Sequence, residues 1–340
     1  MIKFGIIGCG VIAPFHARAI QASEGGELYA VCDIIPQKAD DMAKEFSVSK
    51  VYYDYKEMLR DKEVDAVCIC TPSGIHGEIA LDSARCGKHI LCEKPLEITK
   101  EKLDNLISEL SRYNVKTGCV FQRRFQQIPM MVKEAIDKGT FGKCLVADTY
   151  LKYYRSPEYY KSAGWRATWE LDGGGALMNQ GVHGIDLINW FMGGVESVHA
   201  ITSVQRHDIK VEDTAVAIAR FKNGAVGVIE GTTCVYPAQQ TRFELHFERG
   251  SIIFNDTGIL QWNLDGKEYS NTGNDEEGLN LSIDPRAIGK MSHLPIVQDF
   301  INAIKEDRAP MIVPRDGRKA VDIILSIYKS SKEDKTIYIE

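Results

Sequence analysis

Near its amino terminus the chain reads Lys3-Phe4-Gly5-Ile6-Ile7-Gly8-Cys9-Gly10-Val11-Ile12-Ala13, and this stretch decides the fold. An apolar run typical of a buried strand leads into the spacing GxGxxA, ahead of a helical stretch over 14–23. The first glycine of this pattern permits a tight turn, and the second lets the backbone approach a pyrophosphate. We therefore expect a dinucleotide cofactor to contact Gly8, Gly10, Val11 and Ile12.

A second apolar run, Glu27–Val31, ends at Cys32-Asp33. This is about the distance from the glycine loop at which an acidic residue binds the adenosine ribose hydroxyls. A carboxylate there also repels a 2′-phosphate, so Asp33 favours NAD over NADP. The alternative is that Asp33 only caps a turn after the strand.

Strands and helices continue to alternate as far as residue 121. The expected helices cover 37–46, 75–86 and 100–113, and the expected strands cover 64–70, 89–92 and 115–120. Such alternation predicts parallel, right-handed βαβ units. The sequence thus predicts an α/β protein whose first domain, residues 1–121, is a doubly wound parallel Rossmann sheet.

Ligands of such sheets bind beyond the carboxyl ends of the strands. Two of the expected strands are followed directly by candidate residues. After the strand over 64–70 come Thr71, Pro72, Ser73 and His76, and after the strand over 89–92 come Glu93 and Lys94, followed by Pro95. We expect all six candidates to contact the cofactor, and Lys94 also to contact the substrate; proline stiffens the backbone that presents it. His76 has a second interpretation as a surface helix residue. Beyond the last strand, Gln122 is assigned to the cofactor and Arg123 to the substrate.

The pattern changes in residues 122–340, which we assign to a second domain that binds substrate and mediates oligomerisation. Strand-like runs follow one another with few helices between them, over 145–154, 198–205, 214–221, 225–232, 242–247 and 251–254. Asn223-Gly224 between two of them is a strong hairpin signal. We expect an α/β domain with an open, predominantly antiparallel or mixed sheet. Further helices are expected over 129–138, 296–305 and 317–330, and a last strand over 336–339.

One helix in this half, expected over 176–191, follows Asp172-Gly173-Gly174-Gly175. Asn179, His183 and Asp186 are spaced so that they project from one helical face. A lone helical histidine is more often a structural hydrogen-bonding residue than a catalyst. Three polar groups on one face beside a triple glycine favour a catalytic interpretation, because buried polar groups need partners.

An aromatic and basic loop lies just upstream, over 153–169. Such loops pack over cofactors or polyols, so we assign Tyr154 to the substrate and Trp165 and Arg166 to the cofactor. Tyr236 is a further substrate candidate. The alternative for each is a packed surface loop or an oligomer contact. The polar stretch 270–292 is expected to be a loop or lid.

The length, net charge and composition of the chain exclude several classes of function. A chain of 340 residues is long enough for two domains. Its net charge of −6 argues against nucleic-acid binding, which needs a basic surface. No run has the length of a membrane span, and no convincing signal peptide is present. The nine cysteines show no metal-binding spacing, so we expect no metal site and a reducing, cytoplasmic location.

The glycine loop, Asp33, Thr71-Pro72 with His76, Glu93-Lys94-Pro95 and the segment from Gly173 to Asp186 together resemble the Gfo/Idh/MocA oxidoreductases. The resemblance covers nearly the whole chain. It implies hydride transfer between a nicotinamide cofactor and a secondary alcohol of a sugar, cyclitol or nucleotide-linked sugar. It also implies that Lys94 is the catalytic lysine and His183 the acid/base, and that an exposed sheet face forms a homodimer or homotetramer.

Asn179 departs from the family pattern, since inositol dehydrogenase-like members carry aspartate at that position. Asparagine cannot ionise, so whether His183 or Lys94 takes the alcohol proton is left open. We favour His183 as the base, with Lys94 donating a hydrogen bond to the reacting oxygen and Asn179 orienting the pair. Other stretches resemble UDP-N-acetylglucosaminuronate 3-dehydrogenases. In all, the residues that we expect to bind the substrate are Lys94, Arg123, Tyr154, Asn179, His183 and Tyr236. Two alternative functions are a redox-assisted NAD-dependent glycosidase and a non-catalytic sugar-sensing protein.

Overall fold

The computed structural model describes residues 1–268, 289 and 291–340. The chain divides into two compact units, the first comprising Met1–Gln122 and Gly289–Arg318 and the second comprising Arg123–Ile288 and Lys319–Glu340. The first boundary falls within one residue of the expected one. The structure differs from the expected division in one respect, because residues 289–318 group with the first unit. Most of the expected loop or lid over 270–292 lies outside the described residues.

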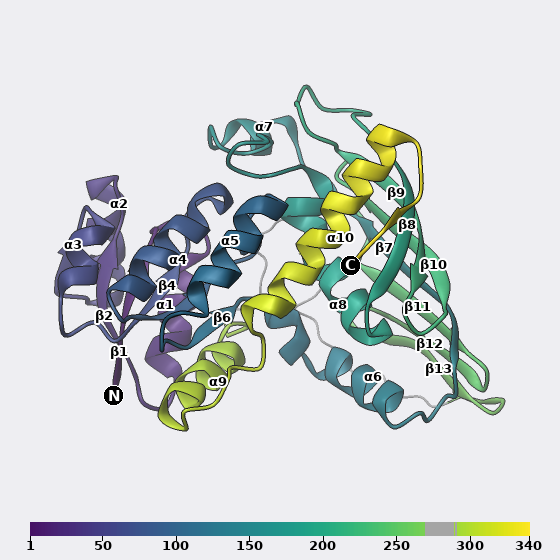
Figure 1. The fold of residues 1–340 in the computed structure, drawn as a ribbon, viewed down its shortest axis with the longest axis horizontal. Coiled ribbons are helices and arrows are strands. Elements are labelled where there is room, and N and C mark those ends of the chain that lie inside the picture. The colour runs from purple at the N-terminus through teal and green to yellow at the C-terminus, as the bar shows by residue number, and fades with distance from the viewer. Residues whose placement is uncertain (269–288, 290) are drawn as a thin grey trace. The chain divides into compact units, whose positions relative to one another are not determined.

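A parallel sheet forms the centre of the first unit, with the strand order β3-β2-β1-β4-β5-β6 (Figure 1). Its strands are β1 (Ile2–Ile7), β2 (Gly26–Cys32), β3 (Lys50–Tyr52), β4 (Ala66–Ile69), β5 (His89–Cys92) and β6 (Thr117–Cys119). β4 is buried throughout and apolar, as expected for a parallel strand covered on both faces. The order reverses between β1 and β4, so this unit has the topological switch point at which doubly wound sheets bind ligands.

The helices of the first unit connect and cover these strands. They are α1 (Ala13–Ala22), α2 (Pro36–Phe46), α3 (Tyr55–Arg60), η1 (Ser73–Ile75), α4 (His76–Arg85), α5 (Lys100–Leu110), α9 (Leu294–Lys305) and the first turn of α10 (Pro314–Glu333). α9 joins the unit through its apolar face, where the Phe300 ring lies 6.3 Å from that of Phe4. Gln298 of α9 also accepts a hydrogen bond from the Glu24 amide at 2.8 Å. These contacts explain why residues 289–318 belong to this unit.

The second unit contains a mixed sheet with the order β14-β13-β12-β11-β7-β10-β9-β8-β15 in the described residues. Its strands are β7 (Cys144–Lys152), β8 (Val195–Ser203), β9 (Thr214–Phe221), β10 (Val226–Thr232), β11 (Arg242–Phe247), β12 (Gly250–Asn255), β13 (Ile259–Leu264), β14 (Lys267–Glu268) and β15 (Ile337–Tyr338). The β7–β10 pair is parallel, and the other described pairs are antiparallel. The predicted fold class is therefore confirmed.

Helices lie against one face of this second sheet, and its other face carries no helix of the described residues (Figure 1). The helical segments are η2 (Gln122–Phe125), α6 (Gln127–Asp137), α7 (Pro157–Lys161), η3 (Ala176–Gly181), α8 (Val182–Met192) and the remainder of α10. Ser330 of α10, for example, accepts a hydrogen bond from the Ala200 amide of β8 at 3.0 Å. Along β9, buried residues alternate with exposed ones, as a sheet covered on one face requires.

The helix expected over 176–191 differs from a single α-helix. Its first part, η3, is a π-helix, and the α-helix α8 follows without a break from Val182. π-Helical turns are rare and occur frequently at functional sites. No helix in the described part of the chain combines the length and apolar character needed to cross a bilayer.

Candidate active site

The glycine loop after β1 has the conformation that its sequence predicts. Gly8 has φ +94°, and a Cβ there would lie 2.8 Å from the Cys70 carbonyl carbon, so only glycine fits between the ends of β1 and β4. Gly10, in contrast, has open space around its Cα, and Val11 is exposed. Ile12 is the N-cap residue of α1. The loop thus presents accessible backbone at a helix N-terminus, as a pyrophosphate needs.

Asp33 lies just beyond the carboxyl end of β2 and is linked to the glycine loop. Its Oδ2 accepts a hydrogen bond from the Cys9 amide at 2.8 Å, and its Oδ1 accepts one from the Ile35 amide at 2.8 Å. The carboxylate is only half-buried. Its position and remaining lone pairs suit the ribose role expected from the sequence.

The segment after β4 is tied to the Glu93-Lys94-Pro95 segment by His76. The two ring nitrogens of His76 lie 2.7 Å from the Pro95 carbonyl oxygen and 2.8 Å from that of Thr71. Burial lowers the pKa of His76, which is 1% exposed, so its interpretation as a surface residue is wrong. Pro72 is half-buried and Ser73 is buried. His76 therefore holds this edge of the sheet together.

Two buried polar atoms at this edge have no hydrogen-bond partner among the described residues. They are Thr71 Oγ1, beyond β4, and Gln122 Oε1, beyond β6. Buried polar groups normally have partners. Together with the open backbone at Gly10 and the position of Asp33, these atoms fit a bound nicotinamide dinucleotide. When bound, that cofactor supplies the hydride acceptor of the reaction.

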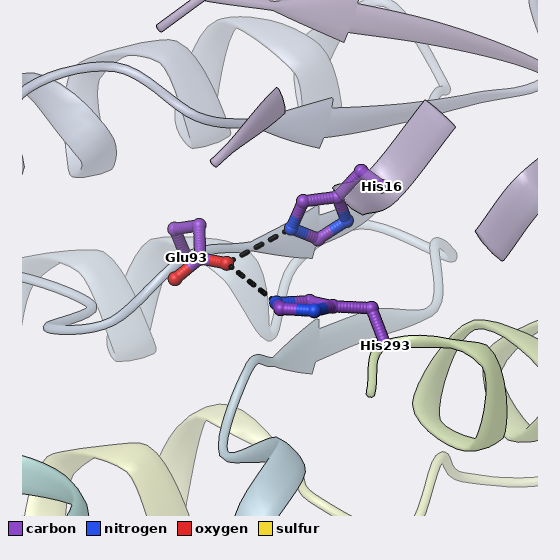
Figure 2. A group of neighbouring side chains, drawn as sticks. All are labelled: His16, Glu93 and His293. Atoms are coloured by element: carbon purple, nitrogen blue, oxygen red, sulfur yellow. Dashed lines mark hydrogen bonds and ion pairs between the residues drawn. The ribbon is translucent and has the colours of Figure 1, made fainter. Parts of the chain in front are cut away.

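Glu93 and Lys94 follow β5 directly. The Glu93 carboxylate is buried, and Figure 2 shows it facing both His16 of α1 and His293, the N-cap residue of α9. Its Oε1 lies 2.9 Å from His16 Nε2, and its Oε2 accepts a hydrogen bond from the Lys94 amide at 3.1 Å. Lys94 itself is half-buried. A cofactor contact of Glu93 stays a prediction.

In the second unit, His183 is the half-buried residue in a stretch, 181–189, that is otherwise buried. Asn179 precedes it by four residues, at the π-helical turn. Asn179 Nδ2 donates a hydrogen bond to Asp172 Oδ1 at 2.6 Å, and its Oδ1 accepts one from Gln180 at 3.2 Å. A carboxylate is therefore one hydrogen bond away from the position where related enzymes carry aspartate. No role for Asp172 was predicted from the sequence.

The triple glycine is held by Glu212, in the loop before β9. Its side chain accepts hydrogen bonds from the amides of Gly175 and Leu177, each at 2.9 Å, and from the Tyr328 hydroxyl at 2.8 Å. The Glu212 carbonyl accepts a further bond from the Ala176 amide. A Cβ at Gly175 would lie 1.8 Å from that carbonyl oxygen, so glycine is required there. Burial raises the pKa of Glu212 to about 7, although these donors oppose the rise.

Two basic residues near the start of the second unit are engaged in buried ion pairs. Arg124 Nε donates to Asp186 Oδ2 at 2.7 Å, and its Nη2 donates to Asp186 Oδ1 at 2.5 Å. The sequence predicted that Asp186 shares one helical face with His183, but in the structure Asp186 is a buried structural partner of Arg124. Arg123 Nη1 lies 3.1 Å from Asp256 Oδ1. A substrate contact of Arg123 stays a prediction.

The aromatic and basic loop brings several candidates together. The Arg166 guanidinium lies over the rings of Tyr159 and Trp165, at 4.3 and 4.8 Å from their centroids, and donates to the Tyr159 hydroxyl at 2.6 Å. Gln180 donates to the same hydroxyl at 2.8 Å, so this loop reaches the π-helical segment. Separately, the rings of Tyr154 and Tyr236 meet edge to face at 5.0 Å.

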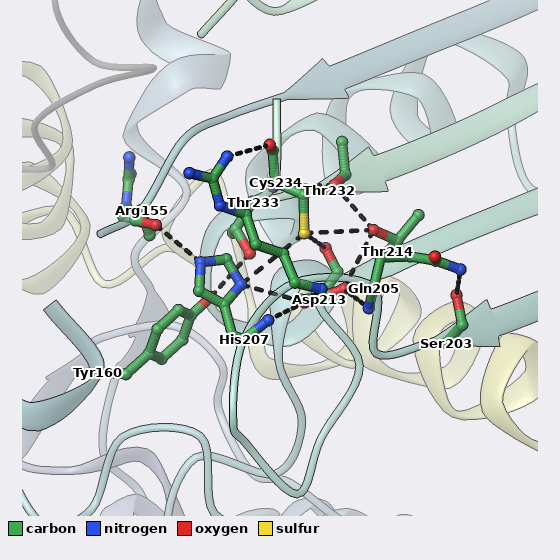
Figure 3. Close-up of polar contacts among 11 residues, drawn as sticks. Arg155, Tyr160, Ser203, Gln205, His207, Asp213, Thr214, Thr232, Thr233 and Cys234 are labelled. Atoms are coloured by element: carbon green, nitrogen blue, oxygen red, sulfur yellow. Dashed lines mark hydrogen bonds and ion pairs between the residues drawn. The ribbon is translucent and has the colours of Figure 1, made fainter. Parts of the chain in front are cut away.

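A second buried cluster anchors this loop to the segment before β9 (Figure 3). His207 Nε2 lies 2.8 Å from the Arg155 carbonyl oxygen, and His207 Nδ1 lies 3.1 Å from Asp213 Oδ2. The Asp213 carboxylate also accepts hydrogen bonds from the amides of Gln205, Arg206 and His207. Although burial acts in the opposite direction, these amides lower the pKa of Asp213 to about 2. Glu212 and Asp213 thus hold two neighbouring parts of the candidate site.

The fold and these sites define a two-domain oxidoreductase with a nucleotide cofactor. Residues 2–121 match the model of the oxidoreductase family with an NAD-binding Rossmann fold, and residues 130–253 match that of the GFO/IDH/MocA C-terminal domain. The chain belongs to the Gfo/Idh/MocA family, as its motifs predicted. It is an NAD(P)-dependent dehydrogenase acting on CH–OH groups.

Relatives of this chain align with it along its whole length. The myo-inositol 2-dehydrogenase of Thermotoga maritima is 28% identical, with 100% of this chain and 99% of the relative covered. The WlbA dehydrogenase of Bordetella pertussis, solved with NADH and UDP-GlcNAcA, is 30% identical and superposes with a TM-score of 0.87, covering 100% of this chain and 99% of that one. A levoglucosan dehydrogenase solved with NADH and levoglucosan is 26% identical, with a TM-score of 0.86 and coverage of 100% and 99%.

Proposed function

We propose that this dehydrogenase oxidises a secondary alcohol of a sugar with His183 as the base. The observation that carries the proposal is the hydrogen bond between Asn179 and Asp172 at the π-helical turn that precedes His183. A free histidine has a pKa of about 6.5, so it needs little tuning to accept a proton near neutral pH. The negative charge of Asp172, one hydrogen bond away from Asn179, favours the imidazolium that forms when His183 takes the hydroxyl proton.

Lys94 has the complementary role in this proposal. An ordinary lysine has a pKa of about 10.4 and is charged at neutral pH, so it donates hydrogen bonds rather than accepting protons. Its ammonium group binds the reacting oxygen and stabilises the negative charge that develops there. The oxygen becomes the carbonyl oxygen of the product as the hydride leaves.

A nucleotide-linked sugar acid is our first candidate for the substrate. Arg166 has a buried Nε without a hydrogen-bond partner among the described residues, and its guanidinium lies over the rings of Tyr159 and Trp165. Such a group binds carboxylates and phosphates well. The similarity to WlbA, solved with UDP-GlcNAcA, supports the same class. A neutral cyclitol is the second candidate, favoured by the similarity to myo-inositol 2-dehydrogenase.

The test is NADH formation with a panel of UDP-linked uronates, free uronates, inositols and neutral sugars. We expect kcat/KM to be highest for an acidic, nucleotide-linked member. In Arg166→Met, the KM for that member should rise about tenfold or more, as for loss of a charged hydrogen bond. If only the KM for NAD rises, the result would support the cofactor contact of Arg166 that the sequence predicted instead of a substrate contact. Equal activity on inositols and uronates would overturn the choice of substrate.

The same assay separates the two alternative functions. A redox-assisted glycosidase retains its NAD and releases an aglycone without net NADH. A sensing protein binds a sugar without turnover. Net, stoichiometric NADH formation supports the dehydrogenase.

We further propose that the protein is a cytoplasmic homodimer or homotetramer. None of its nine cysteines forms a disulfide in the described residues, which fits a reducing compartment. One face of the second sheet carries no helix of the described residues (Figure 1). Because the other face is covered, the exposed apolar side chains of neighbouring strands, including Ile201 of β8 and Ile218 of β9, belong to this face. Contiguous exposed apolar surface of this kind is typical of an interface.

A further inference from the structure

Three buried side chains from distant parts of the sequence meet just beyond β5. His16, Glu93 and His293 come from α1, the β5 end and the start of α9, and their side chains are 0%, 8% and 0% exposed (Figure 2). The two imidazole rings lie 4.8 Å apart and are tilted by 58°. All three residues belong to the first unit. The family resemblance accounts for Glu93 but for neither histidine.

Both histidines are directed at one oxygen of the carboxylate. His16 Nε2 lies 2.9 Å and His293 Nε2 lies 3.5 Å from Glu93 Oε1. The other oxygen, Oε2, accepts the hydrogen bond from the Lys94 amide. His293 is held in turn through its Nδ1, which lies 3.0 Å from the Ser292 hydroxyl. A continuous chain of contacts therefore leads from the two imidazoles through the carboxylate to the backbone of Lys94.

The charge of Glu93 depends on these partners. Burial by itself would raise the pKa of its carboxyl group, but the contacts with His16 and His293 hold that pKa well below the usual range. A buried carboxylate that lost both partners would either take up a proton or seek another cation. The ammonium group of the adjacent Lys94 is the nearest one along the chain.

We propose that His16 and His293 are positioning residues for Lys94 and act through Glu93. The two histidines hold the Glu93 carboxylate in the interior of the first unit, where it accepts the hydrogen bond from the Lys94 amide and so fixes the Lys94 backbone. They also prevent the carboxylate from competing with the substrate for the Lys94 amine. The catalytic importance of this device rests on the proposed function, in which Lys94 binds the reacting oxygen. Groups that orient metal ligands contribute about tenfold to a hundredfold in affinity or activity, and we expect a similar factor for groups that orient Lys94.

The test compares leucine and glutamine at each histidine position. His16→Leu and His293→Leu remove the contact with Glu93, whereas His16→Gln and His293→Gln keep an N–H donor. We expect kcat for the best substrate of the panel to fall about tenfold or more in the leucine variants. It should recover largely in the glutamine variants, and the Kd for NAD should change little. His89→Leu is the matched control, since His89 is a half-buried histidine of β5 that binds the Lys116 amide instead.

A double-mutant cycle separates positioning from simple stabilisation. If His293 acts through Glu93, His293→Leu should have little further effect on kcat in a Glu93→Gln background. Additive losses in the cycle, or equal losses in the leucine and glutamine variants, would overturn the proposal. Copurification of one equivalent of a divalent metal with the wild type, lost in His16→Gln, would also overturn it, because the three residues would then be metal ligands.

A readout independent of turnover distinguishes this inference from the proposed function. The reactivity of Lys94 toward acetic anhydride, followed by mass spectrometry across pH, should change in both leucine variants relative to Lys116 in the same digest. An altered Lys94 profile in a protein that oxidises no sugar would support the positioning role and reject the proposed function. An unaltered profile and unaltered kcat in an active enzyme would reject the positioning role alone.

Discussion

Asp33 binds the glycine loop and is placed to bind the cofactor as well. Because its carboxylate repels a 2′-phosphate, we expect the wild type to bind NAD more tightly than NADP. Asp33→Ala removes both effects, so NAD binding should weaken about tenfold or more while NADP binding improves. Isothermal titration of both cofactors measures the ratio. Tighter binding of NADP by the wild type would contradict the assignment.

Substitution distinguishes the roles of His183 and Lys94, because each variant should change the pH–rate profile in a different way. His183→Ala should lower kcat by roughly two to four orders of magnitude, the usual contribution of a general base. It should also abolish the acidic limb of the pH–rate profile, since that limb reports protonation of the base. The profile of kcat against pH between about 5 and 9 measures both effects.

Lys94→Ala serves as the comparison variant for this pair. It should impair turnover but leave NAD affinity nearly unchanged and retain the acidic limb. If His183→Ala keeps normal turnover and the same limb, then Lys94 or water is the base.

At the scale of single elements, the segment over 176–192 shows where sequence reasoning reached its limit. The spacing of Asn179 and His183 and the preceding glycines predicted a polar helical site. A π-helical turn was not predictable, because it depends on Glu212 and Tyr328, which are distant from this segment in the sequence. Glu212 binds the backbone amides of Gly175 and Leu177, and Tyr328 binds Glu212. No local pattern tells which backbone amides the carboxylates of Glu212 and Asp213 bind.

Glu212 makes the stability of this element depend on pH. Its pKa is about 7 in the folded chain and about 4.3 in an unfolded one. Because the folded state binds the proton more tightly, the contribution of Glu212 to the free energy of unfolding is largest below about pH 4 and is lost as pH rises to about 7. The loss is on the order of 3 kcal/mol. Urea unfolding at several pH values should show this component in the wild type but not in Glu212→Gln.

Tyr328→Phe is the control for this effect. The Tyr328 hydroxyl donates to Glu212 and so lowers its pKa. Removing the hydroxyl should raise that pKa further and move the loss of stability to higher pH. Parallel stability curves for the wild type and Glu212→Gln would show that Glu212 does not titrate in this range.

At the scale of the whole molecule, the sequence predicted both sheets but not the path of the chain between the units. Alternating strands and helices predicted the parallel sheet, and successive strand-like runs with few helices between them predicted the second, predominantly antiparallel sheet. The return of residues 289–318 to the first unit was not predicted. It depends on contacts such as Phe4 with Phe300 and Glu93 with His293, which join residues about 200 or more positions apart. Periodicity within a segment carries no information about such pairs.

At the same scale, we predict that the helix-free face of the second sheet forms the interface between copies of the chain. Ile201 and Ile218, on neighbouring strands β8 and β9, are 72% and 64% exposed, and Val216, paired with Ile201, is 44% exposed. If this face joins two copies, a charge introduced there must be buried without a partner, which costs several kcal/mol and opposes association. We therefore expect Ile201→Asp combined with Ile218→Asp to be a monomer by light scattering at micromolar concentration, with the wild type a dimer or tetramer. Met130→Asp, on the exposed side of α6, should leave the mass of the assembly unchanged. A monomeric wild type, or a double variant that still assembles, would place the interface elsewhere or show that none exists.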